Sequence, residues 1–266
     1  MKYMTFRSSC SFAGVANMLS RFGVEVQDRD IALGMGLPYL FAHEDGCYLT
    51  GPMLQSAVWF NLYLHPIGFH LEEAQVPRSQ VCGCLRQQAC AMLGLRTGSG
   101  KHAVVYLGMQ GDALHFLNNK WQHSDEPETL LLTEAELSAH LDDQVMIATL
   151  YPIPPESADL SPLRRESCTV LRANLAEISR LCGSRETVAA LRDKMDPLFR
   201  AMLLDGITML GLIGESELAR QFTMVQTCLL AALRQEPSTT LCLGDFLPLA
   251  QLEDAVSAYI RLIENA

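Results

Sequence analysis

The chain has 266 residues, of which 49% are hydrophobic and 19% are charged, and its formal net charge is −10. This is the composition of a globular protein with enough apolar residues for one large domain or two modest ones. The acidic balance, without any cluster of basic residues, argues against nucleic acid as a partner.

The start of the sequence lacks the apolar region of a secretory signal peptide. It also contains no run of about 18 apolar residues that would cross a membrane. The nine cysteines are an odd number and are scattered through the chain. These features favour a cytoplasmic protein with reduced thiols and no membrane association.

The first half of the sequence alternates helical and strand patterns. Apolar residues at helical spacing predict a first helix at 10–23, closed by Gly23 and preceded by the capping residues Ser8 and Ser9. In chain order, the pattern then predicts a short helix that ends in a glycine-containing loop (28–41), a helix (51–63), a strand (64–70), a helix (77–88), a strand (89–96), a two-stranded hairpin (100–121), a capped helix (133–141) and a strand (144–153).

The composition changes at 152–162, where four of eleven residues are proline, as in a linker. Beyond it, helix periodicity predicts a bundle of four or five helices, with segments at 163–181, 185–204, 215–235 and 247–265. We therefore expect an α+β domain at 1–151, a linker at 152–162 and an α-helical domain at 163–266. The leucines and methionines of the helical half fit a bundle core, and a homodimer surface is the alternative use for them.

Three polar residues of the first half stand at the ends of predicted elements. Cys10 heads the first helix, where backbone N–H groups and the helix dipole favour a thiolate. His102 opens a buried strand and Asn118 ends the next one, so the amide can lie beside the imidazole and fix its tautomer and orientation. The three residues are therefore a candidate nucleophile, base and orienting residue.

This layout resembles that of papain-like cysteine peptidases, in which a cysteine heads the central N-terminal helix and the histidine and asparagine follow on strands. The resemblance covers about residues 1–151 and is nearest to two bacterial branches. Bacteriocin-processing (double-glycine) peptidases have a cysteine, a histidine and an aspartate in this order. The matching positions in this chain are Cys10 in "CSFAGVANML", His102 in "HAVVYLG" and Asn118. In the N-terminal domain of butirosin biosynthesis acyltransferases, a glycine-containing segment is similar to "ALGMGLPYLF". The resemblance implies a papain-like fold, with helices packed on an antiparallel sheet.

The sequence departs from the peptidase pattern at the oxyanion donor. That family carries a glutamine five or six residues before the cysteine, where this chain has Thr5 and Met4. The backbone N–H of Cys10 with the hydroxyl of Ser8 or Ser9 is the expected substitute. Asn119 is a further candidate for a contact to the substrate or oxyanion, and it is also the second candidate to face the imidazole, although Asn118 fits the spacing better.

Two classes of function follow from these observations. The first is a thiol-dependent acyl-transfer enzyme that attacks a peptide or a small amide or thioester substrate and needs no cofactor. Its acyl group passes either to water, as in a peptidase or amidase, or to an amine, as in an acyltransferase. The second is a retired papain-like module that binds a ligand or partner without cleaving it, which the missing glutamine favours.

No metal site is expected. Cys82 and Cys84 have C-x-C spacing on a predicted helix, with no second cysteine or histidine pair nearby, which favours helix packing over zinc binding. The run His43-Glu44-Asp45 is interpreted as a polar loop insertion beside the expected cleft.

Overall fold

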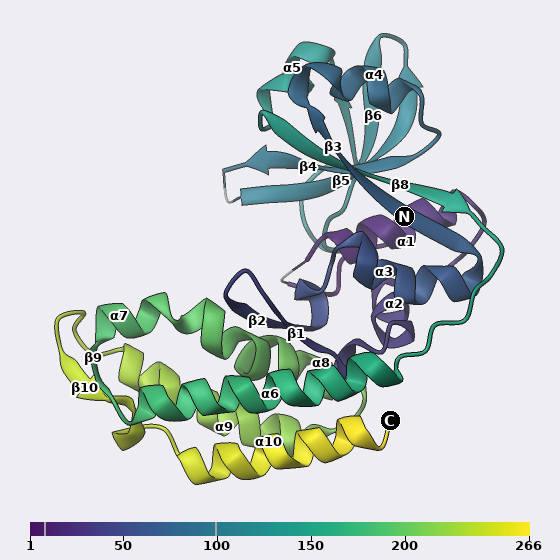
Figure 1. Ribbon diagram of the computed structural model, residues 1–266. Coiled ribbons are helices and arrows are strands. Elements are labelled where there is room, and N and C mark those ends of the chain that lie inside the picture. Colours follow the sequence, from purple (N-terminus) through teal and green to yellow (C-terminus); the bar gives the residue numbers. More distant parts are fainter. Residues whose placement is uncertain (8, 99) are drawn as a thin grey trace. The chain divides into compact units, whose positions relative to one another are not determined.

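The computed structural model of the chain describes residues 1–7, 9–98 and 100–266. They form two compact units (Figure 1). The first unit comprises Met1–Met35 and Gln55–Ala158, and the second comprises Gly36–Leu54 and Asp159–Ala266. Each unit has a hydrophobic core of its own.

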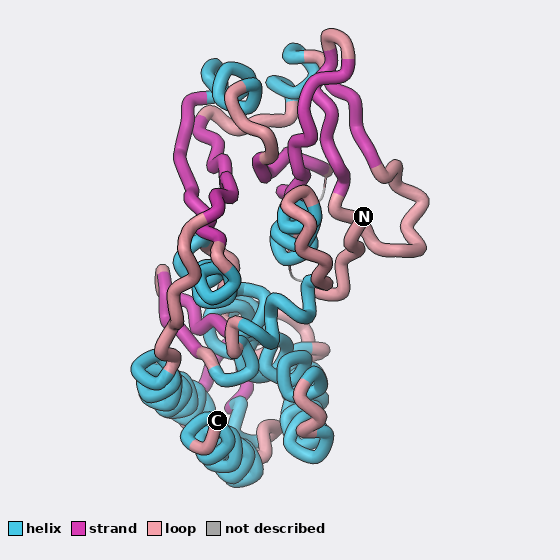
Figure 2. The backbone as a smooth tube through the Cα atoms, turned by 90° about the vertical axis from the view of Figure 1, so that its right-hand side faces the viewer, coloured by secondary structure: helices cyan, strands magenta, loops and turns pink. Residues whose placement is uncertain are grey.

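The first unit is built on a six-stranded sheet in which all neighbouring strands are antiparallel. The order across the sheet is β3-β8-β4-β5-β6-β7. Its strands appear in magenta in Figure 2. Their bounds are β3 (Phe69–Pro77), β4 (Ala91–Thr97), β5 (Gly100–Gln110), β6 (Ala113–Asn118), β7 (Thr129–Leu132) and β8 (Gln144–Pro152).

Helices cover both faces of this sheet. The helices of this unit are α1 (Ser11–Ser20), α2 (Asp28–Gly34), α3 (Ala57–Leu64), α4 (Val81–Arg86) and α5 (Glu134–Ala139). Leu93 and Val104 face the core that includes residues of α4 and α5. Their neighbours Met92 and Val105 face the other way, because successive strand residues alternate, and Met92 lies against Gly14 of α1. The sheet is therefore packed between α1 on one face and α4 and α5 on the other.

The sequence pattern of α1 explains how closely this helix approaches the sheet. Phe12, Val15 and Leu19 recur at helical spacing and are fully buried. A Cβ atom at Gly14 would collide with the side chains of Met92 and Asn119, so glycine lets the helix lie close to the strand without displacing them. The helix ends at Gly23, whose positive φ of 79° is the left-handed conformation of a C-terminal cap.

The second unit is mainly helical, and two short pairs of antiparallel strands accompany its helices. A π-helix spans Met195–Asp205. Three-residue 3₁₀ turns occupy Leu37–Tyr39, Gly51–Met53 and Leu243–Asp245. The α-helices are α6 (Ser161–Cys182), α7 (Val188–Asp193), α8 (Gly206–Leu212), α9 (Ser216–Leu233) and α10 (Leu249–Glu264). Strand β1 (Phe41–Glu44) pairs with β2 (Cys47–Thr50), and β9 (Arg185–Thr187) pairs with β10 (Thr240–Cys242).

The predicted fold class is confirmed: helices pack on an antiparallel sheet, and a largely helical unit follows. The division of the chain differs from the expected one in two places: the first unit extends to Ala158, through most of the expected linker at 152–162, and an internal segment lies in the second unit. Gly36–Leu54 belongs to the second unit, although the sequence suggested an uninterrupted domain at 1–151. The physical reason is packing, because Phe41 and Tyr48 are buried in the core of the helical unit. The run His43-Glu44-Asp45 therefore lies in the β1–β2 hairpin of that unit.

Several predicted elements have different bounds in the structure. The segment 51–63 contains a 3₁₀ turn followed by α3, and the strand expected at 64–70 begins only at Phe69 and continues to Pro77. The helix expected at 185–204 is divided into β9, α7 and the π-helix. Strand β7 was not predicted, because its four residues show no helical or strand period that stands out from the polar loop before it.

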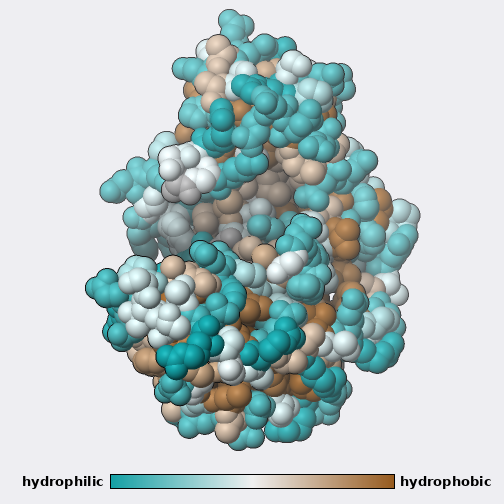
Figure 3. Space-filling model, turned by 60° about the vertical axis from the view of Figure 1, so that its left-hand side comes forward, coloured by the Kyte–Doolittle hydropathy of each residue, from teal (hydrophilic) through white to brown (hydrophobic). Residues whose placement is uncertain are grey.

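The face of the molecule shown in Figure 3 is largely hydrophilic, with scattered hydrophobic areas. Among the residues that the structure describes, no helix combines the length and the hydrophobicity of a membrane-spanning segment.

Candidate active site

Cys10 lies directly before α1 as its N-cap residue, with backbone angles in the helical region (φ −91°, ψ −11°). Its carbonyl oxygen accepts a helical hydrogen bond from the N–H of Gly14 at 3.1 Å. The first N–H groups of a helix have no intrahelical acceptors, so they produce a positive potential at its start. The first turn of α1 contains no acidic residue to offset that potential. The predicted position of Cys10 at a helix start is confirmed.

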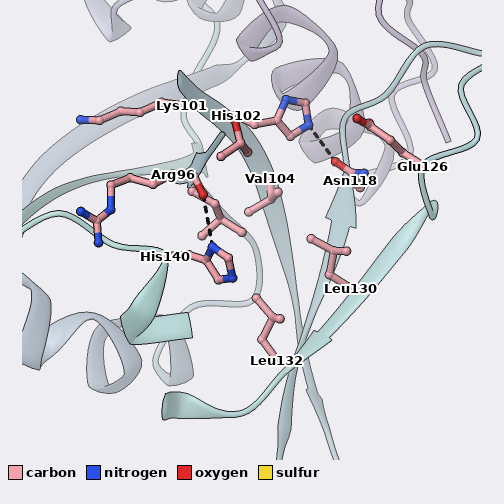
Figure 4. Close-up of a pocket in the computed structure, with 11 residues that line it drawn as sticks. Arg96, Lys101, His102, Val104, Asn118, Glu126, Leu130, Leu132 and His140 are labelled. Atoms are coloured by element: carbon pink, nitrogen blue, oxygen red, sulfur yellow. Dashed lines mark hydrogen bonds between the residues drawn. The ribbon is translucent and has the colours of Figure 1, made fainter. Parts of the chain in front are cut away.

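His102 and Asn118 come from the adjacent strands β5 and β6. The register pairs Asn118 with Val104, two residues beyond His102, so all three lie on one face of the sheet. Nε2 of His102 is 2.7 Å from Oδ1 of Asn118 (Figure 4). Nδ2 of Asn118 donates to the carbonyl oxygen of Pro127 at 3.0 Å, which turns Oδ1 toward the imidazole. Asn118, rather than Asn119, is therefore the residue that faces His102.

The thiol of Cys10 and the imidazole of His102 are close enough for each to shift the pKa of the other. Burial by itself raises the pKa of the thiol, but hydrogen bonds from His102 and from the backbone of Ala103 outweigh it and lower the pKa of Cys10 below its ordinary value. The hydrogen bond to Cys10 raises the pKa of His102 above its ordinary value, against the effect of burial. Both shifts favour a thiolate beside an imidazolium.

The other cysteines provide an internal comparison, since all nine are free thiols. Burial raises the pKa of Cys90 and of Cys182 to about 11, and it also raises the pKa of Cys82 and Cys168. In contrast to these four, Cys10 has a lowered pKa, and it is half-buried rather than enclosed. The environment of Cys10 thus differs in kind from that of a buried structural cysteine.

A buried network of amides connects α1 with the strand that carries His102. The N–H of Ala103 donates to Sγ of Cys10 at 3.0 Å, and its carbonyl oxygen accepts from Nδ2 of Asn119 at 2.9 Å. Oδ1 of Asn119 accepts from Nδ2 of Asn17, on α1, at 3.0 Å. Asn119 is fully buried, with 0% of its surface exposed. This corrects the expectation that Asn119 contacts the substrate or the oxyanion, because its amide is engaged inside the protein.

The two serines before the cysteine were candidate oxyanion donors, and Ser8 lies outside the described residues. Ser9 is buried, and its hydroxyl donates to Oε1 of Gln55 at 2.6 Å while accepting from the N–H of Ser11 at 3.2 Å. The single proton of the Ser9 hydroxyl is thus already donated. This corrects the expectation that Ser9 supplies the oxyanion donor, and it brings in Gln55, which no sequence motif had singled out.

A pocket of about 440 Å³ opens beside His102 and Asn118 (Figure 4). Glu126 lines it and contributes to raising the pKa of His102. The pocket was not predicted, because its walls come from four strands and two loops that are distant in the sequence. Its apolar lining includes Leu95, Val104, Leu130 and Leu132, and its polar lining includes Arg96, Lys101, Glu126 and His140.

Within the described parts of the chain, no group of three or more histidine, cysteine or acidic side chains is arranged to hold a metal ion. Cys82 and Cys84 lie on α4, as the predicted helix implies.

Comparison with known proteins returned no matching family model and no matching curated protein. A search of solved structures found similarity to the peptidase domain of Streptococcus ComA, a bi-functional ABC transporter involved in a quorum-sensing pathway. The two chains are 10% identical, with a TM-score of 0.39, and the similarity covers 57% of this chain and 96% of the other.

Proposed function

We propose that this protein is a thiol-dependent acyl-transfer enzyme of the papain-like kind, which forms an acyl-enzyme on Cys10. The observation that carries the proposal is the arrangement at the start of α1, where Cys10 and His102 shift the pKa of each other and His102 is hydrogen-bonded to Asn118. A nucleophile, a base within reach of it and a third group that orients the base are the minimal parts of nucleophilic catalysis at a carbonyl. The substrate class is an amide or a thioester, from a peptide or a small acyl compound.

The reaction begins when the thiolate of Cys10 attacks the carbonyl carbon. A carbon–sulfur bond forms, and the electron pair of the carbonyl π bond moves onto oxygen. When this tetrahedral species collapses, the bond to the leaving amine or thiol breaks and His102 donates a proton to the leaving group. In the second half-reaction, water attacks the thioester while His102 accepts its proton, and collapse releases a carboxylic acid and restores Cys10.

Asn118 acts on this reaction through His102. Because Nε2 of the imidazole is bound to Oδ1 of Asn118, its other nitrogen, Nδ1, is left for the thiol and the leaving group. Asn118 also accepts the Nε2 proton of the imidazolium, a charge-assisted hydrogen bond that favours the ion pair. The side chain therefore fixes both the tautomer and the angle of the ring.

The proposal is tested by trapping the acyl-enzyme. Incubation with an acyl thioester should add one acyl group to the peptide that contains Cys10, as measured by mass spectrometry after proteolysis, and should release thiol over many turnovers. Cys10→Ala should abolish both signals, whereas Cys84→Ala, which removes another half-buried thiol, should change neither. An acyl group that accumulates on Cys10 and is released only by an added amine would identify the acceptor as an amine. Failure of Cys10 to acylate at all would support the retired binding module instead.

A further inference from the structure

Acyl transfer at Cys10 requires hydrogen-bond donors for the oxygen that becomes negative in the tetrahedral species. Such donors must lie close to the sulfur atom, because the oxygen is bound to the carbon that the sulfur attacks. The backbone N–H of Cys10 is suitable, since it has no acceptor among the described residues apart from the adjacent thiol. Thr5, one of the positions before the cysteine, uses its hydroxyl on Asp28 at 2.7 Å. A second donor must therefore come from elsewhere in the fold.

Gln55 is connected by one hydrogen bond to the residue that precedes the nucleophile. Its Oε1 accepts from the hydroxyl of Ser9 at 2.6 Å, and Ser9 is the residue directly before Cys10. The exposed fraction of Ser9 is only 5%, so this hydroxyl is held away from competing water. The amide of Gln55 is thus bound to the residue whose Cα is about 3.8 Å from that of the catalytic candidate.

The same contact orients the amide of Gln55. Because Ser9 accepts from the N–H of Ser11, its proton is directed to Oε1 of Gln55, and the NH₂ group is turned away from Ser9. Within the described part of the chain, Nε2 of Gln55 has no acceptor, and it is not among the fully enclosed polar atoms. Among the described residues, the two N–H donors of Gln55 therefore remain unused, on a half-buried side chain bound to the residue before Cys10.

We propose that Nε2 of Gln55 and the backbone N–H of Cys10 together form the oxyanion hole of this enzyme, with Ser9 as the residue that holds the amide in place. The inference rests on the proposed acyl-transfer function and supplies the donor that Met4 and Thr5 do not. It also gives the buried hydroxyl of Ser9 a role, which is to orient Gln55 rather than to contact the substrate.

The test compares two reactions of the same sulfur atom. Alkylation by iodoacetamide displaces iodide at a saturated carbon and develops no oxyanion, whereas acylation by acetyl-N-acetylcysteamine, a thioester, passes through one. Gln55→Glu keeps the size of the side chain and an acceptor for Ser9 but replaces the NH₂ group by a second oxygen. We expect Gln55→Glu and Gln55→Ala to lower the acylation rate about 10²- to 10³-fold and to leave the alkylation rate of Cys10 within a factor of two or so of the parent rate.

Two further variants complete the design. Ser9→Ala should lower acylation by a smaller factor than either change at Gln55, because the donors remain but lose their orientation. Gln110→Ala is the matched control, since Gln110 is an exposed glutamine of the same unit at the far end of β5. Circular dichroism and thermal unfolding of each variant identify any that fails to fold, and the conservative Gln55→Glu variant decides the outcome if Gln55→Ala does not fold.

The outcomes separate this inference from the function on which it rests. If Cys10 is acylated in the parent protein and equally fast in the Gln55 variants, the inference about the oxyanion hole is overturned. The proposed acyl-transfer function is then still supported. If acylation and alkylation fall by the same factor, Gln55 acts on the thiol rather than on the oxyanion, and the inference is again overturned. If Cys10 of the parent protein alkylates readily but never acylates, the proposed function itself fails.

Discussion

Oδ1 of Asn118 lies 2.7 Å from Nε2 of His102, although sixteen positions separate the two residues in the sequence. The β5–β6 register creates this contact, and the second hydrogen bond of Asn118, to Pro127, holds the amide in one orientation. The imidazole therefore directs its Nε2 proton toward Asn118, which leaves Nδ1 for the proposed reaction with Cys10.

Replacement of Asn118 by alanine should slow acylation of Cys10 by about ten- to a hundredfold, since hydrogen bonds to charged groups are worth about 1.5–3 kcal/mol. Asn118→Asp should retain more activity, because a carboxylate still accepts from Nε2 of His102. The measurement is the rate of thiol release from an acyl thioester by each variant. Equal rates for the two variants would show that Asn118 does not act through its acceptor oxygen.

The alkylation of Cys10 should have a midpoint below the ordinary thiol value of about 8.5, because hydrogen bonds from His102 and Ala103 lower the pKa of the thiol. The thiolate then persists as the pH falls and is lost only when the pH passes the lowered pKa. His102→Ala removes the larger of these two stabilising effects and should move the midpoint upward. Iodoacetamide labelling against pH with peptide mapping measures both values, and the buried Cys90, with a pKa of about 11, serves as the internal reference.

The imidazole of His102 should titrate above its ordinary pKa of about 6.5, since the largest effect on it is the hydrogen bond to Cys10. The stabilisation that this raised pKa adds to the folded state is fully present below pH 6.5 or so and is lost as the pH rises through the folded-state pKa. Cys10→Ser should therefore lower the pKa of His102, as measured by the pH dependence of its NMR ring signals. An unchanged pKa in Cys10→Ser would contradict the predicted thiol–imidazole contact.

Asn119→Ala should destabilise the first unit, because the change leaves the carbonyl of Ala103 and the amide of Asn17 without one buried partner each. The expected loss is about 1–3 kcal/mol for each group that remains unpaired. It should also raise the alkylation midpoint of Cys10, since Ala103 is the residue whose N–H binds the sulfur. Urea unfolding and the alkylation profile measure the two effects, with Gln110→Ala as a control expected to change neither.

Tyr259→Phe tests whether the segment Gly36–Leu54 belongs to the helical unit. Tyr259, on α10, is fully buried, and its hydroxyl donates to the carbonyl oxygen of Pro38 at 2.8 Å. Loss of the hydroxyl leaves that oxygen unpaired and should lower the free energy of unfolding by about 1–3 kcal/mol. Thermal unfolding measures it, and Tyr151→Phe, at a more exposed tyrosine, should have a much smaller effect.

The sequence by itself determined the elements that local patterns encode. The helix after Cys10 follows from the spacing of Phe12, Val15 and Leu19 and from Gly23 at its end. The capping box of Thr133 and Glu136 begins α5, as predicted. These features depend on residues within a few positions of one another, so no knowledge of the tertiary fold is needed to find them.

The same local reasoning was less successful where packing overrides periodicity. The helical spacing of 185–204 gave no sign that β9 would pair with β10, more than fifty positions away. The pair Asp45-Gly46, both residues with positive φ, is a typical hairpin signal that was interpreted only as a polar loop. Whether such a segment joins one unit or the other depends on which core buries Phe41 and Tyr48.

For the candidate site, the sequence determined which residue types stand at the start of a helix and at the ends of two strands, and the resemblance to papain-like enzymes grouped Cys10, His102 and Asn118. Only the tertiary structure decided that Asn118 faces the imidazole while Asn119 is buried against α1, because adjacent residues at a strand end point in different directions. It also decided that Ser9 gives its proton to Gln55. A hydrogen bond between residues 46 positions apart depends on how the chain packs, and no local pattern in the sequence encodes it.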